Sequence, residues 1–419
     1  MDTVHAPQPQ ESLRQLLQIT WSAAPPMPQG MQDNDGGLIG NYLVMACGFC
    51  HGRDDDWKPG VYPRGFLDKV WALDLKDEDA GWVRLPDFPG APRQEMQGVS
   101  VNDEVYLWGG FSYSAPYAYR DGYKLSRQGE QWVWSELPSL PWPLSCGGIC
   151  AHGAQIYLFG GADYDGEQFC SLADRTSRIT RLGSRLLRFD TRKPGEGWQE
   201  VSQCPGTPRV APGMAAVGDT LYLIGGDLID PPEACTVVDS WSFVPQTGCW
   251  QRLRDLPVSV GGFGSGQILF QDRYLLLAAG FQRPKVRNPD GTTRPAYGIP
   301  SRVDRTSWKQ HPSLQGVTYF NHVWVYDTSS GLFGTATPLP YDDNAPSSYV
   351  VGDTWYLFPG ETGGFEWEGE YFGHAPEFVL KGRLELSDRD GMKADDVDGG
   401  AAGEGPVGPD VLSLPRRDR

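Results

Sequence analysis

The chain has 419 residues, 53 of them glycine and 35 proline, and a formal net charge of −17. So acidic a chain is a poor partner for nucleic acid, which is bound through basic surfaces, and no apolar run approaches the roughly 18 residues of a membrane helix. The eight cysteines are scattered, and residues 1–18 lack the basic start and apolar core of a secretory signal. We therefore predict a cytoplasmic protein with reduced thiols, bound to neither nucleic acid nor membrane.

A repeat with one constant half and one variable half runs along the chain. Six times, an aromatic residue is followed 27 to 30 residues later by a glycine that ends an apolar run. From that glycine to the next aromatic residue the distance varies between 24 and 53 residues. The six pairs are Trp21 and Gly48, Trp82 and Gly110, Trp134 and Gly161, Trp198 and Gly226, Trp250 and Gly280, and Phe333 and Gly360. A period near 50 residues indicates a radial or stacked array, with function where the insertions collect.

Each unit predicts four short strands. The first two are joined by a tight turn such as Val217-Gly218-Asp219-Thr220, and the second is an apolar run that ends in the glycine position. A third strand such as residues 186–190 follows the insertion, and the fourth carries the aromatic residue into a Leu-Pro turn such as Leu85-Pro86. Four strands per unit around a channel predict an all-β fold, a β-propeller.

The two ends of the chain predict how the ring closes. The last unit has three strands, the third at residues 378–386, and lacks a fourth. Ile19-Thr20-Trp21, followed by a Pro-rich turn, supplies it, and this pairing hides two strand edges. We predict an N-terminal extension at residues 1–16, a six-bladed propeller at residues 17–386 and a disordered tail at residues 387–419, which is poor in large apolar residues.

All long insertions lie between the second and third strands of a blade, so we expect them on one face, around one mouth of the channel. They are residues 49–67, 111–121, 162–184, 227–239, 281–321 and 361–376. A mouth walled by loops is a small-ligand site by default. The longest insertion is basic, with seven Lys or Arg and two Asp between Arg283 and His311; it contacts substrate or is simply solvated.

Polar side chains are expected to gather at this mouth. Asp227 and Glu361 directly follow glycine positions and are the candidate catalytic carboxylates. The candidate substrate-binding residues are Arg93, Glu95, Asp163, Arg209, Tyr113 and Arg283. The structural alternative stays open for each of them, because acidic residues after strands often form turns and an inner-strand Arg can tie blades together.

The segment Cys47-Gly48-Phe49-Cys50-His51 matches a haem-attachment pattern. Such attachment needs export, and Cys47-Gly48 stands where other units place their glycine pair, so we predict a strand that runs into a loop. No second Cys/His pair with zinc spacing is present. We expect neither a cofactor nor a metal.

The glycine pair, the third strand ending in Tyr-Asp or a similar pair, and the Trp before a Leu-Pro turn resemble Kelch repeats. Three segments are closer to one Kelch family, the N-acetylneuraminate mutarotases (epimerases). They are Pro92-Arg93-Gln94-Glu95, Gly261-Gly262-Phe263-Gly264-Ser265-Gly266 with Ala278-Ala279-Gly280-Phe281, and Pro359-Gly360-Glu361-Thr362-Gly363-Gly364. The resemblance implies a six-bladed propeller that interconverts sialic acid anomers without a cofactor, with Asp227 as base and Arg93 on the substrate carboxylate.

This chain departs from that family at one place. The family has Glu where this chain has Asp227, and an Arg six residues on, where this chain has Glu233. A sugar mutarotase or epimerase therefore competes with a non-catalytic Kelch propeller that binds a glycan or a protein. A lyase or hydrolase is a lesser alternative. A copper oxidase of the galactose oxidase type needs two His and two Tyr at one metal, which the six scattered His do not provide.

Overall fold

The computed structural model describes residues 13–50, 65–112, 116–165, 178–228, 235–298, 303–304, 318–362, 364–373 and 376–387. The chain divides into two compact units, Met1–Leu386 and Ser387–Arg419. All described strands belong to the first unit. The predicted disorder of residues 387–419 concerns residues that, apart from Ser387, lie outside the described ones.

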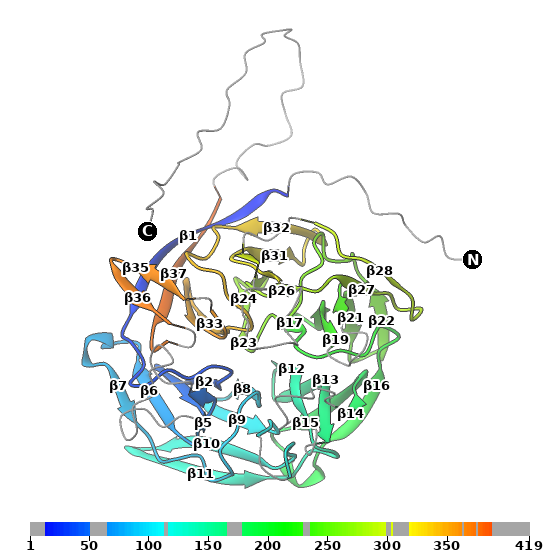
Figure 1. Ribbon diagram of the computed structural model, residues 1–419. Coiled ribbons are helices and arrows are strands. Elements are labelled where there is room, and N and C mark those ends of the chain that lie inside the picture. Colours follow the sequence, from blue (N-terminus) through cyan, green and yellow to red (C-terminus); the bar gives the residue numbers. More distant parts are fainter. Residues whose placement is uncertain are drawn as a thin grey trace. The chain divides into compact units, whose positions relative to one another are not determined.

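The first unit is built from antiparallel sets of four strands, and six such sets can be traced in the described residues (Figure 1). The first three sets are β2 (Asp35–Ile39), β3 (Tyr42–Ala46), β6 (Val70–Asp74) and β7 (Trp82–Arg84); β8 (Gln97–Val101), β9 (Glu104–Trp108), β10 (Gly122–Gln128) and β11 (Gln131–Leu137); and β12 (Ser145–His152), β13 (Gln155–Asp165), β15 (Arg185–Asp190) and β16 (Gln199–Gln203). The other three are β17 (Gly213–Val217), β18 (Thr220–Ile224), β21 (Trp241–Val244) and β22 (Cys249–Arg252); β24 (Leu269–Phe270), β25 (Tyr274–Ala278), β31 (Val323–Asp327) and β32 (Leu332–Ala336); and β33 (Ser347–Val351), β34 (Thr354–Phe358), β37 (Val379–Leu386) and β1 (Gln15–Ala24). We call each set a blade.

The blades surround a common centre, as a propeller requires. Strand β2 contacts β8, β8 contacts β12, and β12 contacts β17, so the first strand of each of these blades lies innermost. Figure 1 shows the same order around the ring. Apolar side chains fill the space between neighbouring blades; one cluster joins Val44 and Val70 of the first blade to Leu107 and Leu125 of the second.

Further short elements lie outside the blades. β19 (Gly226–Leu228), β20 (Cys235–Val237), β27 (Lys285–Arg287) and β28 (Thr293–Pro295) form one sheet, and β26 (Phe281–Gln282), β30 (Thr318–Tyr319) and β29 (Val303–Asp304) form another. The remaining elements are β4 (Phe49–Cys50), β5 (Gly65–Phe66), β14 (Arg178–Leu182), β23 (Gly266–Gln267), β35 (Phe365–Trp367), β36 (Glu370–Phe372) and the 3-10 turns η2 (Glu78–Ala80) and η3 (Pro194–Glu196). Several insertions thus build small sheets of their own, such as β4 with β5 and β35 with β36.

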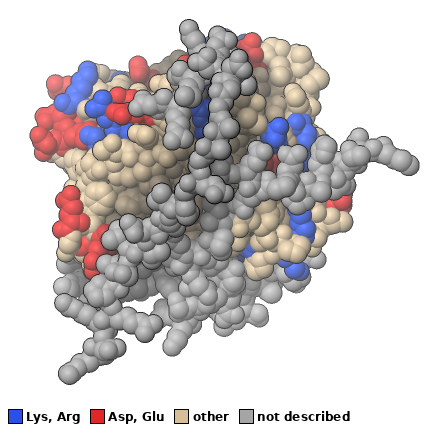
Figure 2. Space-filling view, turned by 90° about the horizontal axis from the view of Figure 1, so that it is seen from above, with Lys and Arg blue, Asp and Glu red and all other residues tan. Residues whose placement is uncertain are grey.

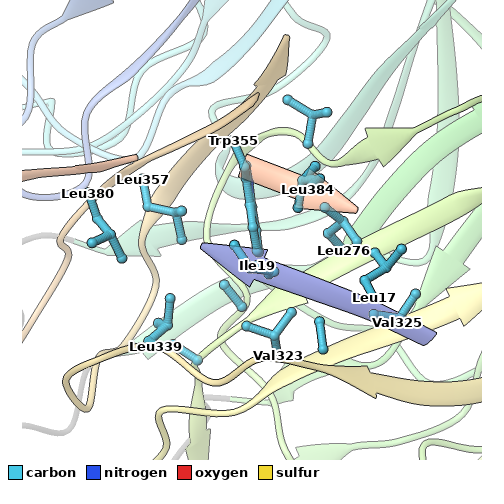
Figure 3. Packing of buried hydrophobic residues seen from close by; sticks show 14 of the residues in the cluster. Leu17, Ile19, Leu276, Val323, Val325, Leu339, Trp355, Leu357, Leu380 and Leu384 are labelled. Atoms are coloured by element: carbon cyan, nitrogen blue, oxygen red, sulfur yellow. The ribbon is translucent and has the colours of Figure 1, made fainter. Parts of the chain in front are cut away.

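The N-terminal strand closes the last blade, as predicted. Residues 17–24 of β1 pair antiparallel with β37, and Gln15 and Leu17 also pair parallel with β32 of the preceding blade. Figure 3 shows Ile19 of this strand near Trp355, and Leu17 near Leu276 and Val325. Strand β1 therefore joins two blades into one nine-stranded sheet.

The recurring Trp and Leu-Pro positions have a shared role. In three blades the indole of the fourth strand donates a hydrogen bond to a proline carbonyl in the turn that ends the preceding blade. The bonds run from Trp82 to Pro25 (2.9 Å), from Trp134 to Pro86 (3.1 Å) and from Trp21 to Pro338 (2.8 Å). Each bond links neighbouring blades at their outer edge, which explains why the two motifs recur together.

Seven cysteines lie in the described part of the chain, and Cys47 and Cys50 are buried. His51 of the haem-like motif lies outside the described residues. Within the described ranges no group of His, Cys, Asp and Glu could hold a metal ion. Nor does a described helix have the length and apolarity to cross a membrane.

Candidate functional site

Six residues with positive φ form a ring around the centre, one from each blade. In each blade, the residue directly after the glycine position pairs with a residue just before the first strand or at its start. The positive-φ residue comes directly after that partner. The six residues are Asp33, Glu95, Cys146, Ala211, Gly262 and Ala345. We call this set the axial ring. Positive φ is uncommon for residues other than glycine and often marks functional sites.

Backbone hydrogen bonds link successive members of the axial ring. The amide of Glu95 donates to the carbonyl of Asp33 (2.9 Å), that of Cys146 to Glu95 (3.3 Å), and that of Ala211 to Cys146 (2.8 Å). The amide of Ala345 donates to Gly262 (3.1 Å). Five of the six members stay partly exposed although the strands that follow are largely buried. The ring is therefore partly exposed to solvent, and we call its surface the floor of the expected mouth.

One half of the floor is acidic. Asp33, Glu95 and Cys146 are consecutive in the ring, and the other three members are small. The thiol of Cys146 donates to Oε2 of Glu95. Burial, together with the charges of Glu361 and Asp35, raises the pKa of Glu95 to about 7. Burial, with Glu95 and Glu361, likewise raises the pKa of Asp33 well above its usual value.

Glu361 stands beside this acidic half. Its backbone pairs with Asn344, immediately before the ring residue Ala345. The hydroxyl of Tyr319 donates to Oε2 of Glu361 (2.7 Å), and Nδ2 of Asn344 approaches the same oxygen (3.3 Å). Tyr319 comes from β30 in the longest insertion and is fully buried. Two blades thus orient the Glu361 carboxylate at the centre.

Asp227 is held by Arg283. Nε of Arg283 donates to Oδ1 (2.8 Å) and Oδ2 (3.0 Å) of Asp227, and Nη2 donates to Oδ2 (2.7 Å). The Asp227 side chain is 1% exposed and that of Arg283 14%. Burial raises the pKa of Asp227, and the guanidinium opposes the rise. The parallel pairing of β20 with β27 brings the two insertions together.

Arg93 and Arg209 have matching surroundings, and each forms hydrogen bonds to residues of its own blade. Nε of Arg93 donates to the Ala91 carbonyl (2.8 Å), and its Nη atoms donate to both carboxylate oxygens of Asp121 (2.6 and 3.0 Å). Arg209 donates in the same way to the Thr207 carbonyl (2.7 Å) and to Asp239. Both arginines are almost fully buried. These contacts favour the structural alternative; substrate binding by either guanidinium stays a prediction.

The other two predicted residues are Asp163 and Tyr113. Asp163 is in β13 and half-buried, opposite Arg181 of β14, while Ala162 takes the place that corresponds to Asp227 and Glu361. Tyr113 lies outside the described residues. The structure therefore brings Glu95 and Glu361 together at the floor and pairs Asp227 with Arg283.

Sequence reasoning missed several residues of this site. Asp33 occupies in the first blade the place of Glu95 in the second, in Gln32-Asp33-Asn34 against Gln94-Glu95-Met96. Alignment of the repeats would have found it. Tyr319 carried no comparable signal, because it comes from the far end of a long insertion outside the repeat.

The site is suited to proton transfer. It combines a carboxyl group with a pKa of about 7 at Glu95 with a second carboxylate at Glu361, which accepts a hydrogen bond from the phenol of Tyr319. Both acidic residues are partly exposed. Groups that change protonation near neutral pH serve as general acids and bases. In the view of Figure 2, acidic and basic side chains both occur on the described surface.

The fold and its repeated anchors define a Kelch-type β-propeller. A solved structure titled "Structure of YjhT", a propeller of this type, matches 86% of the chain and 97% of its own length, with a TM-score of 0.58 and 16% identity. A Kelch domain-containing protein of Vibrio cholerae is 27% identical over 239 residues, 51% of this chain and 62% of the relative.

Other relatives of the chain carry the name N-acetylneuraminate epimerase. N-acetylneuraminate epimerase of Haemophilus influenzae (strain 86-028NP) is 21% identical over 369 residues, 81% of this chain and 88% of the relative. The protein of the same name from Pasteurella multocida is 26% identical over 315 residues, 74% of this chain and 66% of the relative. No family model matches the chain. The predicted resemblance to Kelch propellers and to this epimerase family is confirmed.

Proposed function

We propose that this chain is a mutarotase- or epimerase-like propeller that opens and recloses the ring of a sialic-acid-like or other sugar by general acid–base catalysis. The observation that carries the proposal is the proximity of two acidic residues at the axial ring, Glu361 and Glu95, both of which are partly exposed residues. Similarity over 81% of the chain to a protein named N-acetylneuraminate epimerase supports the same reaction class.

In this reaction the anomeric hydroxyl loses a proton, the bond from the anomeric carbon to the ring oxygen breaks, and the ring oxygen gains a proton. Rotation of the open carbonyl form and reclosure on the other face give the second anomer. Glu361 accepts the hydroxyl proton, and Glu95, partly protonated at neutral pH, supplies the other. Such assistance typically gives about 10²- to 10⁴-fold, and neither step needs a cofactor or metal.

Asp227 is the second candidate for the base, on the resemblance to the epimerase family. Its carboxylate is almost fully buried, and both oxygens accept hydrogen bonds from Arg283. A base must reach the proton that it abstracts, so the more accessible Glu361 is the better candidate. In this scheme Asp227 fixes the guanidinium of Arg283.

A proton NMR time course tests the proposal. Freshly dissolved single-anomer N-acetylneuraminic acid, galactose and glucose are each followed with and without protein. Faster equilibration that falls about 10²-fold or more in Glu361→Gln supports the scheme. If Asp227→Asn lost the acceleration of anomer exchange and Glu361→Gln kept it, the base would be Asp227 and not Glu361. The matched control is Glu130→Gln at an exposed position.

The Asp227–Arg283 ion pair favours a second candidate function, which is binding without catalysis. A carboxylate whose two oxygens are already bonded is suited to holding a binding surface in place. A propeller that binds a glycan or a protein without catalysis would then broaden a sugar's NMR signals, or leave them unchanged, without accelerating anomer exchange. The same time course separates these outcomes.

A further inference from the structure

The hydrogen-bond donors described at the two candidate carboxyl groups differ in strength. Glu361 accepts at one oxygen, Oε2, from the hydroxyl of Tyr319 (2.7 Å) and from Nδ2 of Asn344 (3.3 Å). Glu95 accepts at its Oε2 from the thiol of Cys146, and a thiol is a weak donor. Hydrogen bonds to the ionised form of a carboxyl group favour ionisation. These donors therefore favour a negative charge on Glu361 over a negative charge on Glu95.

The two carboxyl groups also act on each other through their charges. Burial raises the pKa of Glu95 to about 7, the Cys146 thiol opposes the rise, and the charges of Glu361 and Asp35 add to it. The charges of Glu95 and Glu361 act on Asp33 as well. When acidic groups share a site, their surroundings decide which of them holds a proton and which stays ionised. The group with the weaker donor, Glu95, is then the one that holds the proton.

Tyr319 is held in a fixed position by the insertion that carries it. Strand β30 pairs antiparallel with β26, and Tyr319 lies opposite Phe281 in this pair. The two aromatic side chains form a small buried cluster of their own. The guanidinium carbon of Arg283 lies 4.8 Å from the centre of the Phe281 ring. A buried ring on a paired strand has little freedom to turn away, so its hydroxyl stays directed at Glu361.

Cations of the same insertion do not replace this hydrogen bond. The described cations of the insertion are Arg283, Lys285, Arg287 and Arg294. Of these, Arg283 interacts with Tyr319: burial works against its charge, but Asp227 and, more weakly, Tyr319 raise its pKa. The charge of Arg283 is offset by Asp227, which accepts hydrogen bonds from its Nε and Nη2. The donors Tyr319 and Asn344 therefore stabilise a charged Glu361.

We propose that Tyr319 is a positioning residue that keeps Glu361 ionised and so leaves the proton on Glu95. The inference rests on the proposed function, because it explains which of the two carboxyl groups is the base. Tyr319 does not touch the sugar in this scheme and acts through the Glu361 carboxylate. The longest insertion thus contributes to the reaction from its far end, through a residue that lies outside the repeat.

Carbon NMR of the full chain, labelled at the side-chain carboxyl carbon of glutamate, tests the proposal without any sugar. Glu361→Gln and Glu95→Gln assign the two signals. In the wild type we expect Glu361 to titrate at lower pH than Glu95. Tyr319→Phe removes only the hydroxyl and should raise the pKa of Glu361 by about one unit. The pKa of Glu95 should fall in the same variant, because its neighbour then carries less charge.

Tyr326→Phe is the matched control. Tyr326 is buried on β31 of the fifth blade, and its ring packs against Phe333. Loss of its hydroxyl should leave both titrations unchanged. Thermal melts confirm folding. If Tyr319→Phe does not fold, 3-fluorotyrosine at position 319 keeps the shape of the ring and makes the hydroxyl a more acidic donor, which should lower the pKa of Glu361.

The outcomes separate this inference from the proposed function. Titration of Glu361 at the same pH in wild type and Tyr319→Phe overturns the inference, whatever the time course of anomer exchange shows. Titration of Glu95 below Glu361 in the wild type overturns it too. The expected shifts, without faster exchange of any sugar, support the placement of the proton by Tyr319 and overturn the enzyme.

Where the wild type accelerates anomer exchange, the rate gives a second test. Tyr319→Phe should lower kcat about tenfold near neutral pH and leave KM nearly unchanged, because the phenol acts on the base and not on the sugar. The acid limb of the pH–rate profile should move to higher pH in the same variant. A raised KM with unchanged kcat would make Tyr319 a substrate-binding residue and would overturn the inference.

Discussion

Arg283 and Asp227 are 56 residues apart in the chain and form a buried ion pair through three donor–acceptor contacts of 2.7 to 3.0 Å. The pair joins the insertion of the fourth blade to that of the fifth, where β20 and β27 run parallel. Its position at the mouth means that it also fixes the wall of the proposed sugar site.

Removing the cation alone should be costly. Arg283→Met leaves Asp227 buried without its partner, and breaking one side of a buried pair costs about 3–5 kcal/mol. Urea unfolding would measure the loss, and the double variant Arg283→Met with Asp227→Leu should recover most of it. Arg283→Lys should recover less than the double variant, since an ammonium cannot reproduce the two-pronged geometry. Full stability of Arg283→Met alone would contradict a structural role for the pair.

Stability should fall with rising pH because of Glu95. Its pKa is raised from 4.5 to about 7 by burial and by Glu361 and Asp35, so the folded protein binds a proton there that the unfolded chain releases. The stabilisation is complete below pH about 4.5 and is lost as the pH rises toward about 7. We expect a loss of about 1–3 kcal/mol, reduced from the full linkage value because Glu95 is partly exposed.

Unfolding of wild type and Glu95→Gln at pH 5 and pH 8 measures this effect. The variant should match the wild type at pH 5 and be the more stable protein at pH 8. Glu130→Gln, an exposed acid, serves as the control and should follow the wild type at both values. Parallel pH profiles for wild type and Glu95→Gln would assign the pH dependence to another group.

The fold was predictable because its signals are local and repeated. Alternating apolar residues and tight turns recur along the chain, with Trp and Leu-Pro positions in most blades, and the unpaired third strand predicted at residues 378–386 pointed to closure by the N-terminus. The site was only partly predictable. Asp227 and Glu361 stand at repeat positions, whereas the partners Arg283 and Tyr319 come from an insertion whose folding no repeat constrains.

Arg93 and Arg209 show why residue type and position alone did not decide function. Both follow a proline at the start of a blade, as a ligand-binding arginine there would. Their acidic partners, Asp121 and Asp239, lie at the start of the third strand of the same blade, 28 and 30 residues on. That pairing depends on the register of the sheet, so it became visible only in three dimensions.

A stability comparison separates the two roles of Arg209. Arg209→Met would leave Asp239, 1% exposed, without its ion pair and should lower the free energy of unfolding by about 3–5 kcal/mol. The exposed pair of Arg185 with Glu200 is the control, and Arg185→Met should cost at most about 1 kcal/mol. An Arg209→Met protein with wild-type stability and weakened sugar binding would instead support the predicted role of Arg209 in substrate binding.

Closure by β1 should govern the stability of the ring. Leu17 is fully buried and Ile19 5% exposed, and both pack between the last two blades, whose outer strands β1 joins. Leu17→Ala and Ile19→Ala should each cost about 2–4 kcal/mol, because each leaves a cavity in this cluster. Leu332→Ala, at a side chain 45% exposed, should cost well under 1 kcal/mol.

Removal of residues 1–24 should have a larger and different effect. It exposes the edge of β37, whose partner strand is lost along eight paired positions, and an unpaired edge of this length promotes association between chains. We expect concentration-dependent aggregation, measured by light scattering, and partial rescue by a separate peptide of residues 13–26. A truncated chain that stays monomeric with wild-type stability would show that the ring does not depend on this closure.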